Sequence, residues 1–266
     1  MSEDIKNTTE NTGSVKERTG SSGSWVSALI IGICVVLSAA ALAAGLYLFR
    51  SNKTNTIAAT GSASVDFTSD LVVWSGSFRV YSTSSKDAYT QIQRDADKVR
   101  DFLRGYGITS DEVLFKAVSI SEVTHNNYDE NGNYVNSLID GYNLSQYIEV
   151  TSSDIDKVER VSREVSQLIA SGIDFNSYSC EYYYTKLDDL KLDLIEKATT
   201  NAKERISIIA RVNNANLGKL TGSSLGVFQI TARNSGTGSY SYDGAFDTSS
   251  RDKTASVTVR LEYELH

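Results

Sequence analysis

The sequence has no proline and only two cysteines and two histidines among its 266 residues. Without proline, tight turns must rely on Gly, Asn and Asp. Two cysteines exclude a disulfide framework, and so few Cys and His residues exclude a Cys/His zinc pattern. Cys34 lies in an apolar run near the N-terminus, so Cys180 is the only thiol in the rest of the sequence.

Basic residues are also scarce, since 26 Lys and Arg stand against 33 Asp and Glu and give a formal net charge of -7. Nucleic-acid binding needs clustered Lys and Arg, so this balance argues against such a partner. With 22% charged and 40% hydrophobic residues, the composition is globular rather than disordered. Beyond the N-terminal region roughly 210 residues remain, enough for one large domain or two small ones.

One long apolar run, residues 25–49, contains no charged residue. A helix of this length, at ~1.5 Å per residue, spans the hydrocarbon of a bilayer. The apolar stretch of a cleaved signal peptide is shorter, ~7–15 residues. The small residues at 41–44 could be a cleavage site, but apolar residues continue to Phe49. We therefore predict an uncleaved transmembrane anchor, with cleavage as the alternative. Ile33 before Cys34 is not the small residue that lipidation requires.

The residues around this run predict the orientation. Residues 1–24 are rich in Ser, Thr, Asn and Glu and predict a disordered cytoplasmic tail, and residues 50–56 predict a linker. The positive charges on the two sides differ only slightly in number. A short polar tail before a large C-terminal domain favours a single-pass protein of the inner (cytoplasmic) membrane, with residues 57–266 on the periplasmic or extracytoplasmic side.

Alternating apolar and polar residues predict several strands in the C-terminal part. We expect strands at residues 57–67, 72–80, 111–123, 138–150, 173–184, 220–232 and 254–265. The first two are separated by a turn at 68–70 and are typical of a hairpin. Residues 124–137 are polar and predict turns, and residues 233–253 predict a long loop.

Apolar residues at helical spacing predict three helices. The first runs from Ser85 to Gly105 or Gly107, the second ends at Gly172, and the third spans 187–212. Helix, Gly, Ile and strand follow one another at both Gly107 and Gly172, which we interpret as a weak internal repeat. The third helix has an apolar stripe and ends at Asn213-Asn214, since Asn tolerates the left-handed conformation. The stripe comprises Leu187, Leu190, Leu194, Ala198, Ala202, Ile206 and Ile209.

The predicted order is β-β-α-β-β-α-β-α-β-β. Strand pairs mixed with helices favour an α+β fold, a largely antiparallel sheet with helices packed on one face. One N-terminal transmembrane helix precedes it.

Three segments resemble the SIMPL-domain family, which includes bacterial periplasmic immunogenic proteins. They are the opening strand pair at 59–78, the helix and strand start "KATTNAKERISIIARVNNANLGKL" at 197–220, and the closing strand at 253–265. The resemblance spans nearly all of residues 57–266, although Asn213-Asn214 stands where that family usually has a small Gly. It implies an exported or membrane-anchored protein with no established catalytic residues, in a family where some members form ring-like oligomers.

No catalytic constellation is visible. His125 lies in a polar turn region and His266 is the last residue, so both are expected in solvent rather than in a triad or metal cluster. Cys180 lies in a strand with alternating tyrosines and predicts a buried, inert thiol. We expect no cofactor, no metal and no enzymatic activity.

Three further segments have simpler interpretations than a site. "DENGN" at 129–133 lacks the Gly position of a calcium loop and predicts a hairpin turn at Asn131-Gly132. "GTGSYS" at 236–241 lacks the third Gly and the following helix of a dinucleotide loop. Asp188-Asp189 near a helix start is typical of acidic residues that stabilise a helix through its dipole. A pair of glycosidase acids remains an alternative.

Tyrosine is abundant, and exposed aromatic residues are typical of interfaces. Half-buried strand residues are the equal alternative. The candidate interface residues are Tyr182, Tyr183, Tyr184, Tyr240 and Tyr242. Two hypotheses follow: an anchored envelope protein that forms homo-oligomers as a scaffold or interaction module, or an extracytoplasmic binding domain for a small ligand or envelope polymer. In the second, the 124–137 and 233–253 loops form the site, and its ligand is unknown.

Overall fold

The computed structural model describes residues 24–51 and 55–266 and divides the chain into two compact units between Asn55 and Thr56. The predicted tail, residues 1–24, lies outside the described residues apart from Ser24. Residues 52–54 of the predicted linker also lie outside them. The α+β prediction is confirmed, because the second unit combines helices with sheets that are almost wholly antiparallel.

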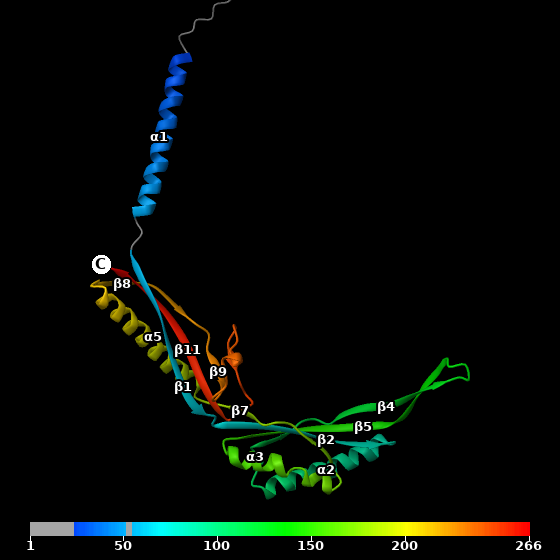
Figure 1. Ribbon diagram of the computed structural model, residues 1–266. Helices are drawn as coiled ribbons and strands as arrows, with labels where there is room; N and C mark the ends of the chain where they lie inside the picture. Colours follow the sequence, from blue (N-terminus) through cyan, green and yellow to red (C-terminus); the bar gives the residue numbers. More distant parts are fainter. Residues whose placement is uncertain (1–23, 52–54) are drawn as a thin grey trace, which may run out of the picture. The chain divides into compact units, whose positions relative to one another are not determined.

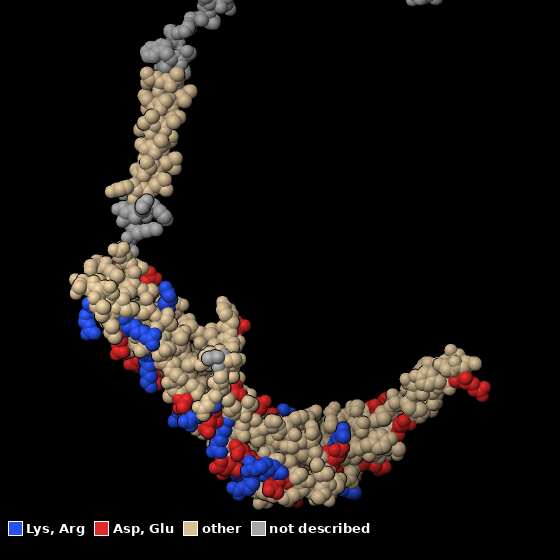
Figure 2. Space-filling model, viewed as in Figure 1, with Lys and Arg blue, Asp and Glu red and all other residues tan. Residues whose placement is uncertain are grey.

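The first unit contains helix α1, Ser24–Ser51. Within it, the 20 residues from Ala28 to Tyr47 are long and apolar enough to cross a membrane. At ~1.5 Å per residue they extend about 30 Å, the thickness of bilayer hydrocarbon. Figure 2 shows no charged side chain along the described part of this helix. By length and composition, α1 is a membrane span or a signal sequence.

The second unit contains two sheets (Figure 1). The first sheet has the path β3-β5-β2-β6, with β4 beside β5 and β7 beside β2. Its strands are β2 Leu71–Ser82, β3 Val113–Phe115, β4 Ser119–Tyr128, β5 Tyr134–Ser152, β6 Asp174–Ser177 and β7 Glu181–Tyr183. In the second sheet, β11 lies between β1 and both β8 and β9. Its strands are β1 Thr56–Thr68, β8 Leu217–Leu225, β9 Gln229–Ala232, β10 Ala245–Phe246 and β11 Asp252–Leu265.

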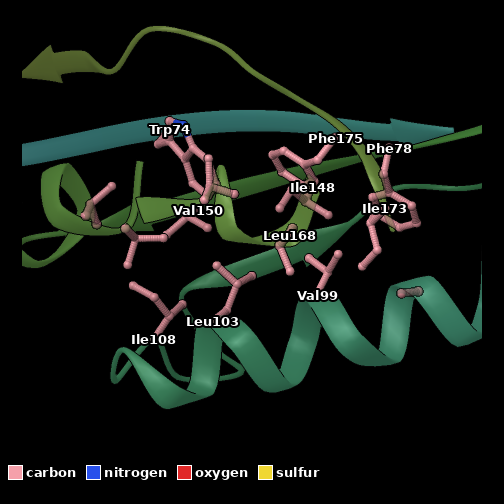
Figure 3. Close-up of a cluster of buried hydrophobic side chains, with 14 of the residues drawn as sticks. Trp74, Phe78, Val99, Leu103, Ile108, Ile148, Val150, Leu168, Ile173 and Phe175 are labelled. Atoms are coloured by element: carbon pink, nitrogen blue, oxygen red, sulfur yellow. The ribbon is translucent and has the colours of Figure 1, made fainter. Parts of the chain in front are cut away.

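Large side chains fill the core of the first sheet. Three helices contribute to it: α2 Ser85–Gly105, α3 Ile155–Glu164 and α4 Gln167–Ala170. Trp74 and Phe78 of β2 point from the sheet toward these helices and are fully buried (Figure 3). The Phe175 ring stacks near both of them, with ring centroids 6.1 and 6.4 Å away. This core is therefore built on aromatic and branched side chains.

Small side chains let the second sheet approach its single helix closely. Helix α5, Leu187–Val212, has the predicted bounds and packs on β1 and β11. A Cβ atom at Gly61 of β1 would overlap the backbone of Ala198 and Ala202 in α5. Most of the predicted stripe is buried, but Ile209 is 42% exposed and Ala210 is buried in its place. The stripe therefore turns with the helix at this end.

The predicted hairpin of the first two strands is wrong, because β1 and β2 belong to different sheets. All of β1 pairs with β11, whereas β2 pairs with β5, β6 and β7. The chain changes sheets at two adjacent residues. Ser69 N donates to Arg251 O, next to β11, and Asp70 N donates to Tyr183 O of β7. The small inward residues of β1 fit α5, and the large ones of β2 fit α2 and α3.

Residues 124–137 form an extended ribbon rather than the predicted turn region. Strand β4 continues to Tyr128 and β5 starts at Tyr134, so only residues 129–133 form the turn. The predicted strand 111–123 is two strands, because the chain leaves the ladder at Lys116–Val118. The predicted strands 173–184 and 220–232 are likewise each divided in two. A ribbon with both faces in solvent needs no apolar alternation, which hid it in the sequence.

Three helices end in the same way, each followed by a strand. The residues with positive φ are Gly107 (84°), Gly172 (83°) and Asn214 (55°). In each case the next residue donates its N–H to the carbonyl five residues earlier, at 3.0 Å, as in a Schellman motif. The pairs are Ile108 to Leu103, Ile173 to Leu168 and Ala215 to Ala210. The prediction of a helix stop at Asn213-Asn214 is confirmed.

Candidate functional site

A cavity with a volume of about 860 Å³ lies on the face of the second sheet opposite α5. Since alternate residues of β1 and β11 point to opposite faces, Gly61 faces α5 and its neighbour Ser62 faces the cavity. The segments 225–229 and 240–243 border the cavity, and we call it the hydroxyl groove. Figure 1 shows the orange segment after β9 on the side of β11 away from α5.

Four hydroxyl side chains form the floor of the hydroxyl groove. Ser62 lies opposite Thr258 in the β1–β11 ladder, and Ser64 lies opposite Ser256. Among the described residues, none of these four hydroxyls hydrogen-bonds to another protein atom. Each hydroxyl can donate and accept, so the floor offers both kinds of hydrogen bond to a ligand.

Two tyrosines form one wall of the groove, held by a side-chain clamp. Gln229 Nε2 donates to Ser241 O at 2.6 Å, and Ser241 N donates to Gln229 Oε1 at 3.1 Å. On either side of the clamped residue, Tyr240 is 54% exposed and Tyr242 is 96% exposed. Asp243 is the one charged residue in the described lining. The wall therefore presents aromatic surface from a fixed piece of backbone.

The other three predicted interface tyrosines lie apart from this wall, near the contact between the two sheets. Tyr182 is half-buried and donates from its hydroxyl to Glu159 Oε1 at 3.0 Å. Burial, reinforced by this hydrogen bond, raises the pKa of Tyr182 to about 12. Tyr183 donates to Glu181, and the Tyr184 ring lies 5.0 Å from that of Phe67. These three side chains thus have partners within the chain.

The extent of this architecture matches a known family. A family model described as SIMPL, a protein of unknown function (DUF541), matches residues 57–263. The chain belongs to the SIMPL family. The match covers both sheets and almost the whole second unit, and it confirms the resemblance seen in the sequence. A search of curated proteins found no match.

A buried lysine joins the two sheets of the SIMPL domain. Lys253 of β11 is 2% exposed, and its Nζ donates to Tyr182 O at 2.9 Å and to Asp247 O. Burial lowers the pKa of Lys253, and the Asp247 carboxylate opposes that effect. Nearby, Arg251 Nη1 lies 2.6 Å from Asp156 Oδ1 of α3. Sequence reasoning missed Lys253, although it falls on the inward side of the alternation in β11, which predicts that its side chain is buried.

The two histidines of the SIMPL domain belong to different segments, one on a strand and one after the last strand. His125 Nδ1 of β4 lies 2.6 Å from Asp140 Oδ1 on an exposed face, and His266 follows β11. Cys180 is half-buried, and burial raises the pKa of its thiol despite a hydrogen bond with Ser162. A thiol with a raised pKa is a poor nucleophile at neutral pH. Neither residue type is assembled with a catalytic partner set in the described chain.

The predicted turn and helix-start residues have local roles. Asp129 accepts from Asn131 N and Asn133 N, and Gly132 has a φ of 81°. The hairpin turn predicted there is confirmed. The hydrogen bonds from Asn133 lower the pKa of Asp129. Asp188 in the first turn of α5 pairs with Lys191. Within residues 24–51 and 55–266, no three His, Cys, Asp or Glu side chains are arranged to hold a metal ion.

Proposed function

We propose that this protein is a membrane-anchored member of the bacterial cell envelope whose SIMPL domain self-associates and acts as a scaffold or interaction module. Helix α1 serves as an uncleaved anchor, since its apolar run extends past the small residues at 41–44. The short polar N-terminal segment stays in the cytoplasm, and residues 57–266 lie on the periplasmic or extracytoplasmic side. No catalytic step is part of this proposal.

The β4–β5 ribbon carries the proposal of self-association. Strand β2 pairs with β5 only from Tyr142 onward, so residues 123–139 form a two-stranded ribbon without a third strand. We call residues 123–139 the arm. Large apolar side chains on it are each at least 46% exposed: Tyr128, Tyr134, Val135, Leu138 and Ile139. Figure 2 shows the arm as mostly uncharged, with acidic side chains at its tip.

An isolated two-stranded ribbon is marginally stable in water, and its free edges are open to pairing with another chain. The arm has some support of its own, since the Tyr128 and Tyr134 rings meet edge to face at 6.3 Å and Asp129 holds the turn. Burial of its remaining apolar surface against a second copy would add the packing that a third strand or helix normally supplies. The arm is therefore the contact that we assign to the oligomer.

The test is the molar mass of residues 56–266 in solution, by size-exclusion chromatography with light scattering. This unit contains both hydrophobic cores. We expect an oligomer at tens of micromolar, and a monomer when Tyr134, Val135 and Ile139 are changed to Ser, Thr and Thr. A matched control changes the exposed Leu192 and Val212 of α5 to Ser and stays oligomeric. A monomeric wild type, or an arm variant that still associates, would contradict the proposal.

A second candidate function is ligand binding at the hydroxyl groove. It is favoured by a cavity within the usual size range of ligand sites, ~300–1,000 Å³. Its hydroxyls make no hydrogen bond within the described part of the chain, and its aromatic side chains are exposed. The lining includes 240–243 and no residue of 124–137, so of the two segments expected to form the site only the second remains in this proposal. A ligand should raise the melting temperature, and truncation of 234–243, unlike truncation at 129–133, should abolish that rise.

A further inference from the structure

The hydroxyl groove has a lining that selects a class of ligand. This inference rests on the second function proposed above and names the ligand class for that site. Three properties of the lining matter: the pairing of the floor strands, the exposed tyrosines and the near absence of charge.

The backbone of β11, in the middle of the floor, is already paired on both sides. Strand β11 pairs with β1 on one side and with β8 and β9 on the other. In the gap between β8 and β9, Gly226 N donates to Thr258 O at 2.8 Å. An extended peptide therefore cannot pair with β11 inside the groove. At the outer edge of β1, which is the edge strand of the sheet, Ser62 N and Thr60 O already bond to Asn201 and Arg205 of α5. A ligand that lies over this face of the sheet is recognised through side chains, which here are hydroxyls.

The four floor hydroxyls form a regular array. Neighbouring strands lie ~4.8 Å apart and alternate residues along a strand ~6.8 Å apart, so Ser62, Ser64, Ser256 and Thr258 sit near the corners of a rectangle. Such an array can exchange hydrogen bonds with several hydroxyls of one ligand, because each Ser or Thr oxygen donates and accepts. Ligands rich in hydroxyl groups, such as sugars, match this floor.

The tyrosine wall supplies the complementary apolar contact. Tyr242 is 96% exposed, although the adjacent Ser241 is fixed by Gln229 through two hydrogen bonds. The ring is thus presented to solvent from an ordered backbone. Sugar rings have an apolar C–H face beside their hydroxyls, so they can cover a tyrosine ring and reach polar groups at once. Tyr240, on the other side of the clamp, offers a second ring.

The charge of the lining excludes anionic ligands. Its described residues include no Lys or Arg, and Asp243 is acidic. A phosphate or uronate chain would meet a carboxylate and no cation. We infer that the hydroxyl groove binds a short stretch of an uncharged polysaccharide, with its hydroxyls on the floor and its ring faces on Tyr240 and Tyr242.

The test uses the full chain in lipid nanodiscs and isothermal titration calorimetry. The probes are two neutral tetrasaccharides, chitotetraose and cellotetraose, the anionic tetragalacturonate, and an uncharged Gly-Ser peptide. We expect at least one neutral tetrasaccharide to bind, and a Tyr240→Ala/Tyr242→Ala variant to bind it at least tenfold more weakly. A Ser64→Val/Ser256→Val variant, built with residues favoured in strands, should lose a similar factor.

The matched control is Tyr89→Ala, which removes from α2 a tyrosine as exposed as Tyr240 (53% against 54%) and should leave the affinity unchanged. Melting temperatures establish that each variant is folded. No binding of either neutral tetrasaccharide at millimolar concentration, or binding that the tyrosine variant leaves intact, would overturn the inference. Tyrosine-dependent binding of tetragalacturonate alone would overturn the assignment of an uncharged ligand, and binding of the peptide alone would overturn the assignment of a polysaccharide.

Discussion

The two sheets of the SIMPL domain both carry helices on one face, but they pack with side chains of very different size. The first sheet buries Trp74 and Phe78 against α2, α3 and α4. The second buries Ala255 of β11 in one cluster with Ala198 and Ala202 of α5, and Gly61 lies directly beneath that helix. The first core is stabilised by buried volume, whereas the second depends on close approach of backbone to backbone.

The solvent-facing parts of the two sheets differ as well. The first sheet extends into the apolar arm, which suits contact with another protein surface. The second sheet presents the hydroxyl groove, which suits a polar ligand. We therefore propose self-association for one half of the domain and ligand binding for the other, and each half can be disturbed separately.

Removal of volume should damage the first core most. Trp74→Ala leaves a cavity and removes the hydrogen bond from Trp74 Nε1 to Ser177 Oγ, so we expect a loss of about 3–5 kcal/mol in the free energy of unfolding. Urea denaturation followed by circular dichroism measures it. The exposed Tyr89→Ala should change stability by less than about 0.5 kcal/mol. Equal effects of the two changes would contradict the role of Trp74.

Addition of volume should damage the second core. In Gly61→Ala, the new methyl group meets backbone atoms of α5 that cannot rotate away, so we expect a loss of about 3 kcal/mol. The matched change Gly222→Ala in β8 places its Cβ at an ordinary 3.6 Å from Glu262 Cβ and should be nearly neutral. The same denaturation experiment compares them. A tolerated Gly61→Ala would show that α5 does not lie this close to β1.

Acid should lower the stability of the half of the domain built on the first sheet, because Glu112 becomes protonated. Partial burial alone would raise its pKa, but hydrogen bonds from Lys157, Ser152 and Thr109 hold the pKa at about 2, against an ordinary 4.5. The stabilisation is complete above pH 4.5 and is lost as the pH falls toward 2. Glu112→Gln should cost about 1–2 kcal/mol at pH 7 and flatten this acid dependence.

Unfolding curves between pH 7 and 2 test this prediction, with Glu130→Gln at the exposed turn as the control. If the Glu112→Gln variant loses stability with acid as steeply as the wild type, the carboxylate is not the source of the effect.

The smallest predicted effect concerns the end of α5. Asn214 has a φ of 55°, where glycine carries no steric penalty, so Asn214→Gly should stabilise the domain by ~0.5 kcal/mol. Asn213 has a φ of -94° and donates from its side chain to Ile209 O. Asn213→Gly should therefore destabilise by about 0.5–1 kcal/mol. Thermal unfolding measures both variants. Stability changes of opposite sign would locate the helix stop at Asn214, and changes of the same sign would contradict it.

Much of the fold could be predicted because its signals are local. The period of α5 gave its bounds, and the glycine, glycine and asparagine stops marked three helix ends. Strand pairing was not local. Alternation in β1 and β2 is equally consistent with a hairpin and with strands of two different sheets. The structure separates them because Gly61 of β1 fits closely under α5, whereas Trp74 of β2 fits the large core of the first sheet. Both helix contacts are distant in the sequence.

The candidate site was only partly visible in the sequence. Tyr240 and Tyr242 are predictable as interface candidates because exposed aromatic residues are typical of interfaces. Ser62 and Thr258 looked like ordinary outward-facing strand residues, since only the β1–β11 register places them opposite each other. The clamp between Gln229 and Ser241 likewise depends on folding of a loop that has no periodic pattern.

Hydrogen–deuterium exchange of residues 56–266 across a dilution series tests the proposed division most directly. The account predicts that amides in 123–139 exchange slowly at tens of micromolar and rapidly after dilution, because the arm is covered by a second copy. Amides around Ser62–Ser64 and 240–243 should exchange alike at both concentrations, since the hydroxyl groove faces solvent in the oligomer. Exchange in the arm that is independent of concentration, or protection that appears at the groove instead, would contradict it.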